Sequence, residues 1–239
     1  LIIWTTTPWT IPFNLGIMVH PEFTYVKSHV GDEIWIVAKE LAQPFIEGIC
    51  QKAFTILEEF PGKKIAGMRY LHPLHKEIPH FEEIKQEAKN MHTVLLSKEY
   101  VELSEGTGLV HTAPGCGPQD YEVGVRNQLP AFNTVDERGK FPKSMGKFAG
   151  LFAKTDDLEF VKALAAEDAI VAKQKITHEY PHCWRCHKPI IFKTTKQWFF
   201  KVEDLKEQMI ADNKRITWVP ESAFNAFDAW LHNLRDNSI

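Results

Sequence analysis

The sequence has little of what defines several classes of protein. Only four of its 239 residues are cysteine, too few for a disulfide scaffold in a chain of this length. No apolar run approaches the roughly 18–20 residues of a membrane span, and the N-terminal apolar stretch is only Leu1–Trp4. The net charge is −3, so any contact with a nucleic acid needs a local basic patch. We therefore expect no membrane contact and a reducing, cytoplasmic compartment.

The composition is otherwise that of an ordinary globular protein. Hydrophobic residues make up 44% and charged residues 25%, which excludes disorder, collagen and coiled coil. The chain lacks an initial Met and ends at Ile239 without a polar tail, which predicts a piece of a longer polypeptide. The composition changes near Ile176. We expect a compact domain over residues 1–175 and a connecting module over residues 176–239.

Strand and helix patterns mix along the chain without a regular βαβ alternation. This predicts an α+β fold with a largely antiparallel sheet. The expected strands are Phe23–Val30 and Glu33–Ala38, which form a hairpin, then His92–Leu96 and Pro189–Thr194. The expected helices are Lys39–Phe60, one that starts at Pro118 or Asp120, Leu158–Asp168, Val202–Lys214 and Pro220–Arg235. Residues 63–90 predict short strands and loops, and Asp136–Phe141 predicts a turn.

A threonine-rich segment, Thr5–Thr10, follows the first apolar residues. Pro8 and Pro12 exclude a helix interior, so we expect a strand end that continues into an ordered loop. An extended backbone directs Thr5 and Thr7 to one face, where both can act on one ligand. A polar strand edge explains the same residues equally well.

The segment Gly106–Tyr121 is rich in glycine and proline, which let a backbone approach a ligand closely. His111 stands at an expected strand end, and Asp120 at the expected start of a helix. A carboxylate beside a histidine suits recognition of a substrate ammonium; the alternative is that Asp120 caps the helix. A thiol nucleophile built from His111 and Cys116 lacks a third residue that would orient the histidine.

Cys183 and Cys186 form a C-x-x-C motif, which suits one half of a tetrahedral zinc site. The other two cysteines are isolated, and the histidines that flank the motif are too close to complete the site. Either the pair holds zinc together with ligands outside this sequence, or it holds none. A redox role is disfavoured, because no thioredoxin-like βαβ pattern surrounds the motif.

The segments Trp4–Asn14 and Gly106–Tyr121 together resemble the editing insertion, or connective polypeptide (CP1), of isoleucyl-tRNA synthetases. The resemblance continues through Asp136–Phe141, Tyr180–Cys186 and Trp230–Asp236, and so covers essentially the whole chain. Valyl and leucyl relatives typically carry Arg-Pro-Glu-Thr where this chain has Thr-Pro-Trp-Thr, which favours the isoleucyl branch. The ATP-binding signatures of these enzymes are missing, so we expect no amino-acid activation.

The resemblance implies a β-barrel-like core with flanking helices, plus a small zinc-knuckle and helical module. It also implies a site that hydrolyses Val-tRNA(Ile), with valyl-adenylate as a second candidate substrate. Such a second site is needed because a pocket built for isoleucine cannot strongly reject valine. One methylene is worth only about 1–3 kcal/mol, and the isoleucyl-tRNA synthetases are a known example of this limit. A smaller pocket then hydrolyses what fits and excludes isoleucine by steric clash.

Carried onto this sequence, the resemblance implies that Asp120 binds the α-ammonium group, while His111 and Trp4 shape the side-chain pocket. Thr5–Thr7 would surround the ester and a positioned water, without a covalent enzyme intermediate or a cofactor. The implied catalytic residues are Thr5, Thr6, Thr7, His111 and Asp120. The implied substrate-binding residues are Trp4, Thr10, Asn14, Gly115 and Asp120. The family commonly has His where this chain has Cys116, so we expect the edge of this loop to differ from that of its relatives.

The implied partners are the acceptor end of tRNA(Ile) carrying Val and the rest of the parent synthetase, with the fragment itself a monomer. A structural zinc on Cys183 and Cys186 needs a second ligand pair, which the resemblance places before Leu1. Two alternatives stay open. The module could guide the tRNA acceptor end without catalysis, or form a valyl-type site that clears threonine, against which Pro8-Trp9 argues.

Overall fold

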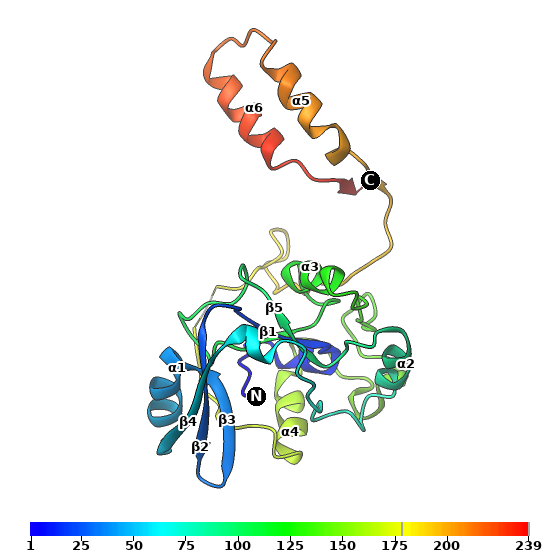
Figure 1. The fold of residues 1–239 in the computed structure, drawn as a ribbon. Helices are drawn as coiled ribbons and strands as arrows, with labels where there is room; N and C mark the ends of the chain where they lie inside the picture. Colours follow the sequence, from blue (N-terminus) through cyan, green and yellow to red (C-terminus); the bar gives the residue numbers. More distant parts are fainter. Residues whose placement is uncertain (178, 239) are drawn as a thin grey trace. The chain divides into compact units, whose positions relative to one another are not determined.

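The computed structural model describes residues 1–177 and 179–238, and the chain divides into two compact units (Figure 1). The first unit is Leu1–Thr194 and the second is Thr195–Ile239. The first unit extends beyond residue 175 because the following segment packs on it. Lys193 Nζ lies 2.9 Å from Glu137 Oε1, and the Ile191 side chain lies against Gly139. The assignment of an editing role to residues 1–175 and a connecting role to residues 176–239 stays a prediction.

Two three-stranded sheets make up the β structure of the first unit. The strands are β1 (Gly16–Val19), β2 (Thr24–Val30), β3 (Glu33–Ala38), β4 (Phe54–Pro61), β5 (Thr93–Leu96) and β6 (Val110–Thr112). One sheet has the order β5-β1-β6, with β1 parallel to β5 and antiparallel to β6. The other has the order β3-β2-β4 and is antiparallel throughout.

The α+β class is confirmed, whereas the expected barrel-like core is not formed by the described residues. A barrel requires strands that close into a ring with staggered pairing. Here each sheet has only three strands, and these strands do not close into a ring. The predicted hairpin is confirmed, with Gly31 in the turn at a φ of 59°. Its alternating β-branched and aromatic residues pair along the full length of β3.

The helices of the first unit are short and lie around these sheets (Figure 1). They are α1 (Lys39–Gln43), α2 (His80–Glu87), α3 (Pro118–Arg126) and α4 (Asp157–Ala166), with short 3₁₀ or π segments η1 (Pro8–Phe13), η2 (Pro44–Ile49), η3 (Gly62–Ile65) and η4 (Lys143–Phe148). The predicted starts of α3 and α4 are confirmed to within one residue. Pro118 suits the first turn of α3, where its missing N–H is not needed.

Three local predictions are wrong. The helix predicted for Lys39–Phe60 ends at Ile49, and the rest of that range contains β4, which pairs with β2. Residues 63–90 contain the helix α2, which buries Phe81 and Ile84. The strand expected at Pro189–Thr194 is reduced to one bridge between His182 and Pro189. In the first two cases, packing between distant segments overrides the local pattern.

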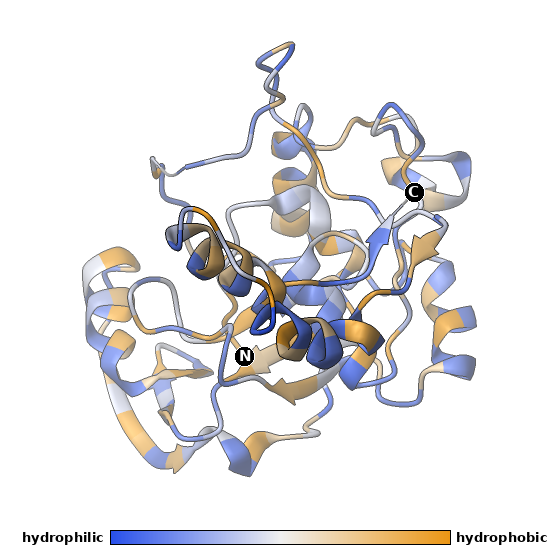
Figure 2. Cartoon of the chain, turned by 90° about the horizontal axis from the view of Figure 1, so that it is seen from above, coloured by the Kyte–Doolittle hydropathy of each residue, from blue (hydrophilic) through white to orange (hydrophobic). Residues whose placement is uncertain are grey.

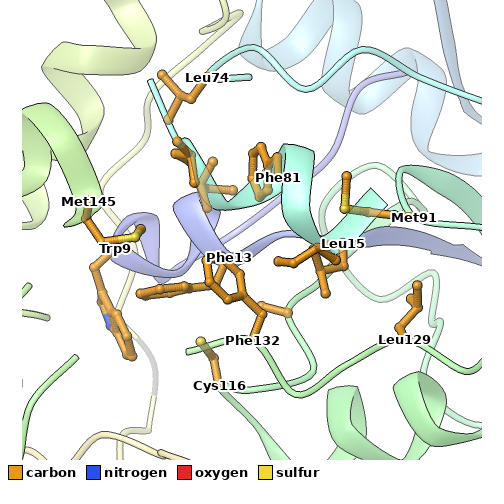
Figure 3. Packing of buried hydrophobic residues seen from close by; sticks show 14 of the residues in the cluster. Trp9, Phe13, Leu15, Leu74, Phe81, Met91, Cys116, Leu129, Phe132 and Met145 are labelled. Atoms are coloured by element: carbon orange, nitrogen blue, oxygen red, sulfur yellow. The ribbon is translucent and has the colours of Figure 1, made fainter. Parts of the chain in front are cut away.

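The main hydrophobic core holds η1 in place from several sides. Phe13 is fully buried, with its ring 5.3 Å from that of Phe132 and 5.2 Å from that of Phe141. Figure 3 shows Trp9, Phe13 and Phe132 within this cluster. Burying one such aromatic side chain contributes about 1.5–3 kcal/mol. The threonine-rich segment therefore leads into a rigid turn.

The second unit contains two helices and a two-stranded sheet. Its elements are β7 (Phe199–Phe200), η5 (Glu203–Leu205), α5 (Lys206–Asn213), α6 (Ser222–His232) and β8 (Asn237–Ser238). Both predicted helices are confirmed, each shorter than expected. The Asp236 carboxylate accepts hydrogen bonds from the backbone N–H groups of Val202 (2.8 Å) and Glu203 (3.1 Å), which joins the two ends of the unit.

Hydrophobic and hydrophilic residues alternate along the helices of both units (Figure 2). This pattern is typical of amphipathic helices at a protein surface. None of the helices in the described parts of the chain has the length and apolar content that crossing a membrane requires.

Candidate functional site

Strand β6 and the loop after it connect most of the residues predicted for the site. The backbone N–H of Trp4 donates to the carbonyl of Leu109 (3.4 Å), and Trp4 forms a parallel bridge with Val110 of β6. The Trp4 ring lies against Gly106, whose φ is 80°. A Cβ at Gly106 would come within 2.8 Å of that ring, so glycine is required twice, for its backbone and for its missing side chain.

The threonine-rich segment follows the Trp4 bridge as the ordered loop that the sequence predicts, and its backbone at Thr5–Thr7 is bent instead of extended. The backbone N–H of Thr7 donates to Thr5 Oγ1 (3.1 Å), a local turn that an extended chain cannot make. The hydroxyl of Thr10 donates to the carbonyl of Thr7 (2.7 Å). Thr5, Thr6 and Thr7 are half-buried. The segment therefore forms a compact loop closed by its own hydrogen bonds.

His111, on β6, is buried with both ring nitrogens occupied. Nε2 lies 2.8 Å from Thr10 Oγ1, and Nδ1 lies 2.9 Å from Asn14 Nδ2. The Thr10 hydroxyl donates its single proton to the Thr7 carbonyl, so it can only accept from His111, which therefore donates from Nε2–H. Nδ1 then accepts from the Asn14 amide. This arrangement corresponds to the neutral Nε2–H tautomer.

Burial lowers the pKa of His111 to about 4, so the ring is neutral near pH 7. A general base needs a free nitrogen and a pKa near the working pH. His111 has neither in this arrangement. The side chain is suited to form a fixed wall.

Asp120 lies in the first turn of α3, where its carboxylate is half-buried. Desolvation raises its pKa to about 7, against the opposing hydrogen bond from the backbone N–H of Ala113, the residue after β6. The start of α3 has no side-chain cap, so capping does not account for Asp120. Within the described residues no cation pairs with this carboxylate. The site thus holds an acceptor that lacks a charged partner.

Gly115 and Cys116 lie in the loop between β6 and α3. A Cβ at Gly115 would meet the carbonyl oxygen of Phe132 at 2.4 Å, so the loop packs tightly against that residue. Cys116 is buried in the core beside Phe132 (Figure 3), and burial raises the pKa of its thiol. A protonated, core-packed thiol does not suit nucleophilic attack.

A cavity of about 850 Å³ opens along the N-terminal segment. Four of the predicted residues line it: Trp4, Thr5, Thr6 and Asn14. His111 and Asp120 are not among the residues that line it. The threonine loop and Asp120 are thus connected through the backbone of β6 and its neighbours, and they do not line one common cavity.

Sequence reasoning missed a second layer of polar residues under the site. Tyr70 donates a hydrogen bond to Asn14 Oδ1, and His92 Nε2 donates to the Asn14 carbonyl (3.2 Å). His72 is buried against the Ile11 carbonyl (3.0 Å) and stacks on His92. The only signal in the sequence was the high density of histidine in residues 70–92.

The C-x-x-C motif forms a tight turn in which the Cys183 N–H donates to Lys188 and the Cys183 carbonyl accepts from His187 (both 2.8 Å). Backbone N–H groups of Cys186 and Arg185 bond to Cys183, and these bonds lower the pKa of its thiol. Cys186 is exposed. No group of three or more metal-binding side chains occurs in the described chain. The two sulfurs therefore fit half of a tetrahedral zinc site and do not complete one.

The sequence matches known proteins along nearly its whole length. Residues 45–239 match the family model of the class I tRNA synthetases (I, L, M and V). The isoleucine–tRNA ligase of Pyrococcus furiosus is 43% identical over 99% of this chain, and that of Methanothermobacter marburgensis is 38% identical over 100%. This chain spans 22% of the length of each.

The fold is similar to that of a solved structure described as GlLeuRS-CP1. The TM-score is 0.53 at 16% sequence identity, and the match covers 73% of this chain and 82% of that one. From the family match, the chain belongs to the class I tRNA synthetases (I, L, M and V).

Proposed function

We propose that this chain is the editing part of an isoleucine–tRNA ligase and hydrolyses Val-tRNA(Ile). The observation that carries the proposal is Asp120, a desolvated carboxylate without a cationic partner in the described residues. The similarity to isoleucine–tRNA ligases supports the choice of substrate. An aminoacyl ester offers the missing cation, its free α-ammonium group.

The ammonium and Asp120 complement each other electrostatically. A positive charge close to a carboxylate favours its ionised form, so substrate binding lowers the pKa of Asp120 from its raised value of about 7. Burial disfavours the ionised carboxylate when no cation is present. The same burial lowers the local dielectric and so strengthens the attraction between the carboxylate and a bound cation. The charge pair then fixes the amino acid at one end, with its ester carbonyl held in place.

Hydrolysis requires one water molecule and no cofactor. The water attacks the carbonyl carbon, the bond from that carbon to the ribose oxygen breaks, and valine leaves as the free acid while the ribose regains its hydroxyl. The half-buried hydroxyls of Thr5, Thr6 and Thr7 are the groups we assign to positioning this water. His111 takes no proton in this account, because both of its ring nitrogens are engaged.

Selectivity for valine over isoleucine follows from pocket residues that are held rigidly in place. His111 is held by Thr10 and Asn14, and Trp4 is held against Gly106. Gly115 is fixed by its packing against Phe132. Because close-packed interiors resist displacement, one extra methylene costs about 1–3 kcal/mol of overpacking. This second sieve excludes isoleucine by size.

Cys183 and Cys186 would supply two thiolate ligands to a structural zinc ion, whose chemistry there is to tie segments of the parent chain together. The missing ligands would come from outside this sequence. Neither cysteine takes part in the proposed hydrolysis.

The proposal is tested by incubating the chain with Val-tRNA(Ile) and with Ile-tRNA(Ile). We expect deacylation of the valyl ester only. Asp120→Ala should slow it by about 10- to 100-fold, since a hydrogen bond to a charged group is worth about 1.5–3 kcal/mol. Glu159→Ala, which removes an exposed carboxylate of α4, is the control and should leave the rate unchanged.

Three results would contradict the proposal. Binding of tRNA without hydrolysis of either ester would indicate a module that only guides the acceptor end. Hydrolysis of Thr-tRNA in preference to Val-tRNA would indicate a valyl-type site. Equal activity of the Asp120→Ala protein would remove the carboxylate from the mechanism.

A further inference from the structure

Tyr70 belongs to no motif that the sequence reveals, yet its hydroxyl reaches the site. Tyr70 Oη donates to Oδ1 of Asn14, a residue 56 positions earlier in the chain. Tyr70 and Asn14 both line the cavity beside the threonine loop. Burial raises the pKa of the phenol, so Tyr70 keeps its proton and stays a donor.

This hydrogen bond acts together with the Gly16 carbonyl to set which way the Asn14 amide faces. The Gly16 carbonyl can only accept, so Nδ2 lies against it, and Oδ1 is left to accept from the phenol. Nδ2 therefore faces the Gly16 carbonyl (2.8 Å) and Nδ1 of His111 (2.9 Å), with a longer contact of 3.4 Å to the Thr112 carbonyl. A rotated amide would place Oδ1 against the Gly16 carbonyl oxygen and would leave the Tyr70 hydroxyl without an acceptor for its proton.

The orientation of the Asn14 amide affects the hydrogen bonds of the threonine loop, because His111 contacts both Asn14 and Thr10. Because Nδ1 accepts from Asn14, the ring proton lies on Nε2, which donates to Thr10 Oγ1 (2.8 Å). The Thr10 hydroxyl is then free to donate to the Thr7 carbonyl (2.7 Å). One unbroken sequence of donors and acceptors thus runs from Tyr70 to Thr7.

We infer that Tyr70 is a positioning residue for the ester hydrolysis: through Asn14 it holds His111 in the Nε2–H tautomer and, through Thr10, it fixes the carbonyl of Thr7. Its effect on rate rests on the proposed function. Its effect on the His111 tautomer does not. The two can therefore be tested separately.

The experiment compares Tyr70→Phe with Tyr25→Phe in the full chain. Both substitutions remove one buried phenol hydroxyl and keep the ring. Tyr25 donates to the Gly108 carbonyl (2.8 Å) and accepts from the His20 backbone N–H (3.0 Å), and neither bond involves Asn14 or His111, which makes it the matched control. The tautomer is measured by ¹⁵N NMR of histidine-labelled protein, with the His111 signals assigned by their loss in His111→Gln. Deacylation of Val-tRNA(Ile) is measured in parallel.

We expect Tyr70→Phe to convert His111 from one tautomer to a mixture and to lower kcat for deacylation by about tenfold, with KM unchanged. Tyr25→Phe should leave the tautomer as it is in the unmodified chain. A single Nε2–H tautomer in folded Tyr70→Phe would overturn the inference, whatever the activity. A tautomer mixture in Tyr70→Phe, together with an unmodified chain that hydrolyses no ester, would support the control of the His111 tautomer by Tyr70 and contradict the proposed function.

Discussion

His111 and Asp120 lie on either side of the same short loop, yet their surroundings differ in kind. His111 has a protein partner at each ring nitrogen, and burial keeps it neutral. Asp120 has one backbone N–H and no cation within the described residues, and the same desolvation leaves its charge uncompensated. A side chain that is fully satisfied by the fold stabilises structure. A side chain that lacks a partner within the protein is suited to bind a ligand that supplies this partner.

The comparison predicts that the two residues separate activity from stability. Asp120→Asn should lower Val-tRNA(Ile) deacylation by about 10- to 100-fold, because the ammonium loses a charged acceptor. The free energy of unfolding should not fall, because a neutral amide is easier to bury than a carboxylate. Rate measurements and urea titrations check the two parts. A large loss of stability would show that Asp120 is structural.

His111→Ala should behave in the opposite way. It leaves Asn14 and Thr10 with buried polar groups that have lost their partner, which costs about 2–3 kcal/mol of stability. Urea unfolding measures this directly. His29→Ala, in the exposed register of β2, is the control and should change stability by less than about 0.5 kcal/mol. An unchanged stability for His111→Ala would place the histidine in the binding machinery alone.

The pH dependence of stability separates the two kinds of group as well. The pKa values of His72 (about 3), His92 and His111 (each about 4) lie below the ordinary 6.5, chiefly through desolvation. The unfolded chain then takes up protons first, so stability is full above pH 6.5 and declines as the pH falls towards 4. The raised pKa of Asp120 acts oppositely between 3.8 and about 7, where the folded chain retains a proton.

Three histidines outweigh one aspartate in this window. We expect the free energy of unfolding to fall by about 2 kcal/mol or more from pH 7 to pH 5. In Asp120→Asn the decline should be steeper, because the opposing contribution is gone. Denaturation with urea at a series of pH values provides the test. A protein more stable at pH 5 than at pH 7 would contradict this assignment of the buried histidines.

The smallest expected effect concerns the wall formed by Trp4. Gly106→Ala introduces strain at a φ of 80° and a clash with the Trp4 ring, costing about 1–2 kcal/mol and a few-fold in deacylation. Gly67→Ala has nearly the same φ, 75°, with nothing within 4 Å of the added carbon. The difference between the two variants therefore isolates the Trp4 contact. Equal effects would show that only backbone strain matters.

Local patterns in the sequence predicted those elements whose signals lie close together. The turn at Gly31 with its flanking β-branched residues gave the first hairpin, and Pro118 gave the start of α3. The prediction from sequence was wrong at β4. There a helical pattern continues past Ile49, but pairing with β2 makes the segment a strand. That pairing joins segments far apart in the chain, which no local window contains.

The same limit applies to the site. The threonine and glycine motifs predict a set of candidate residues, whereas the polar contacts among them could not be foreseen. Tyr70 lies 56 residues from Asn14, and Thr10 lies 101 residues from His111. Only the fold shows that His111 is engaged at both nitrogens while Asp120 is not.

The central claim is that Asp120 awaits the ammonium group of the substrate. The most direct test measures deacylation of Val-tRNA(Ile) and of the same tRNA carrying 2-hydroxyisovaleric acid, which lacks the ammonium group, by the unmodified chain and by Asp120→Asn. We predict that the unmodified chain prefers the valyl ester by about 10- to 100-fold and that Asp120→Asn loses this preference. A preference that survives in Asp120→Asn would contradict the account.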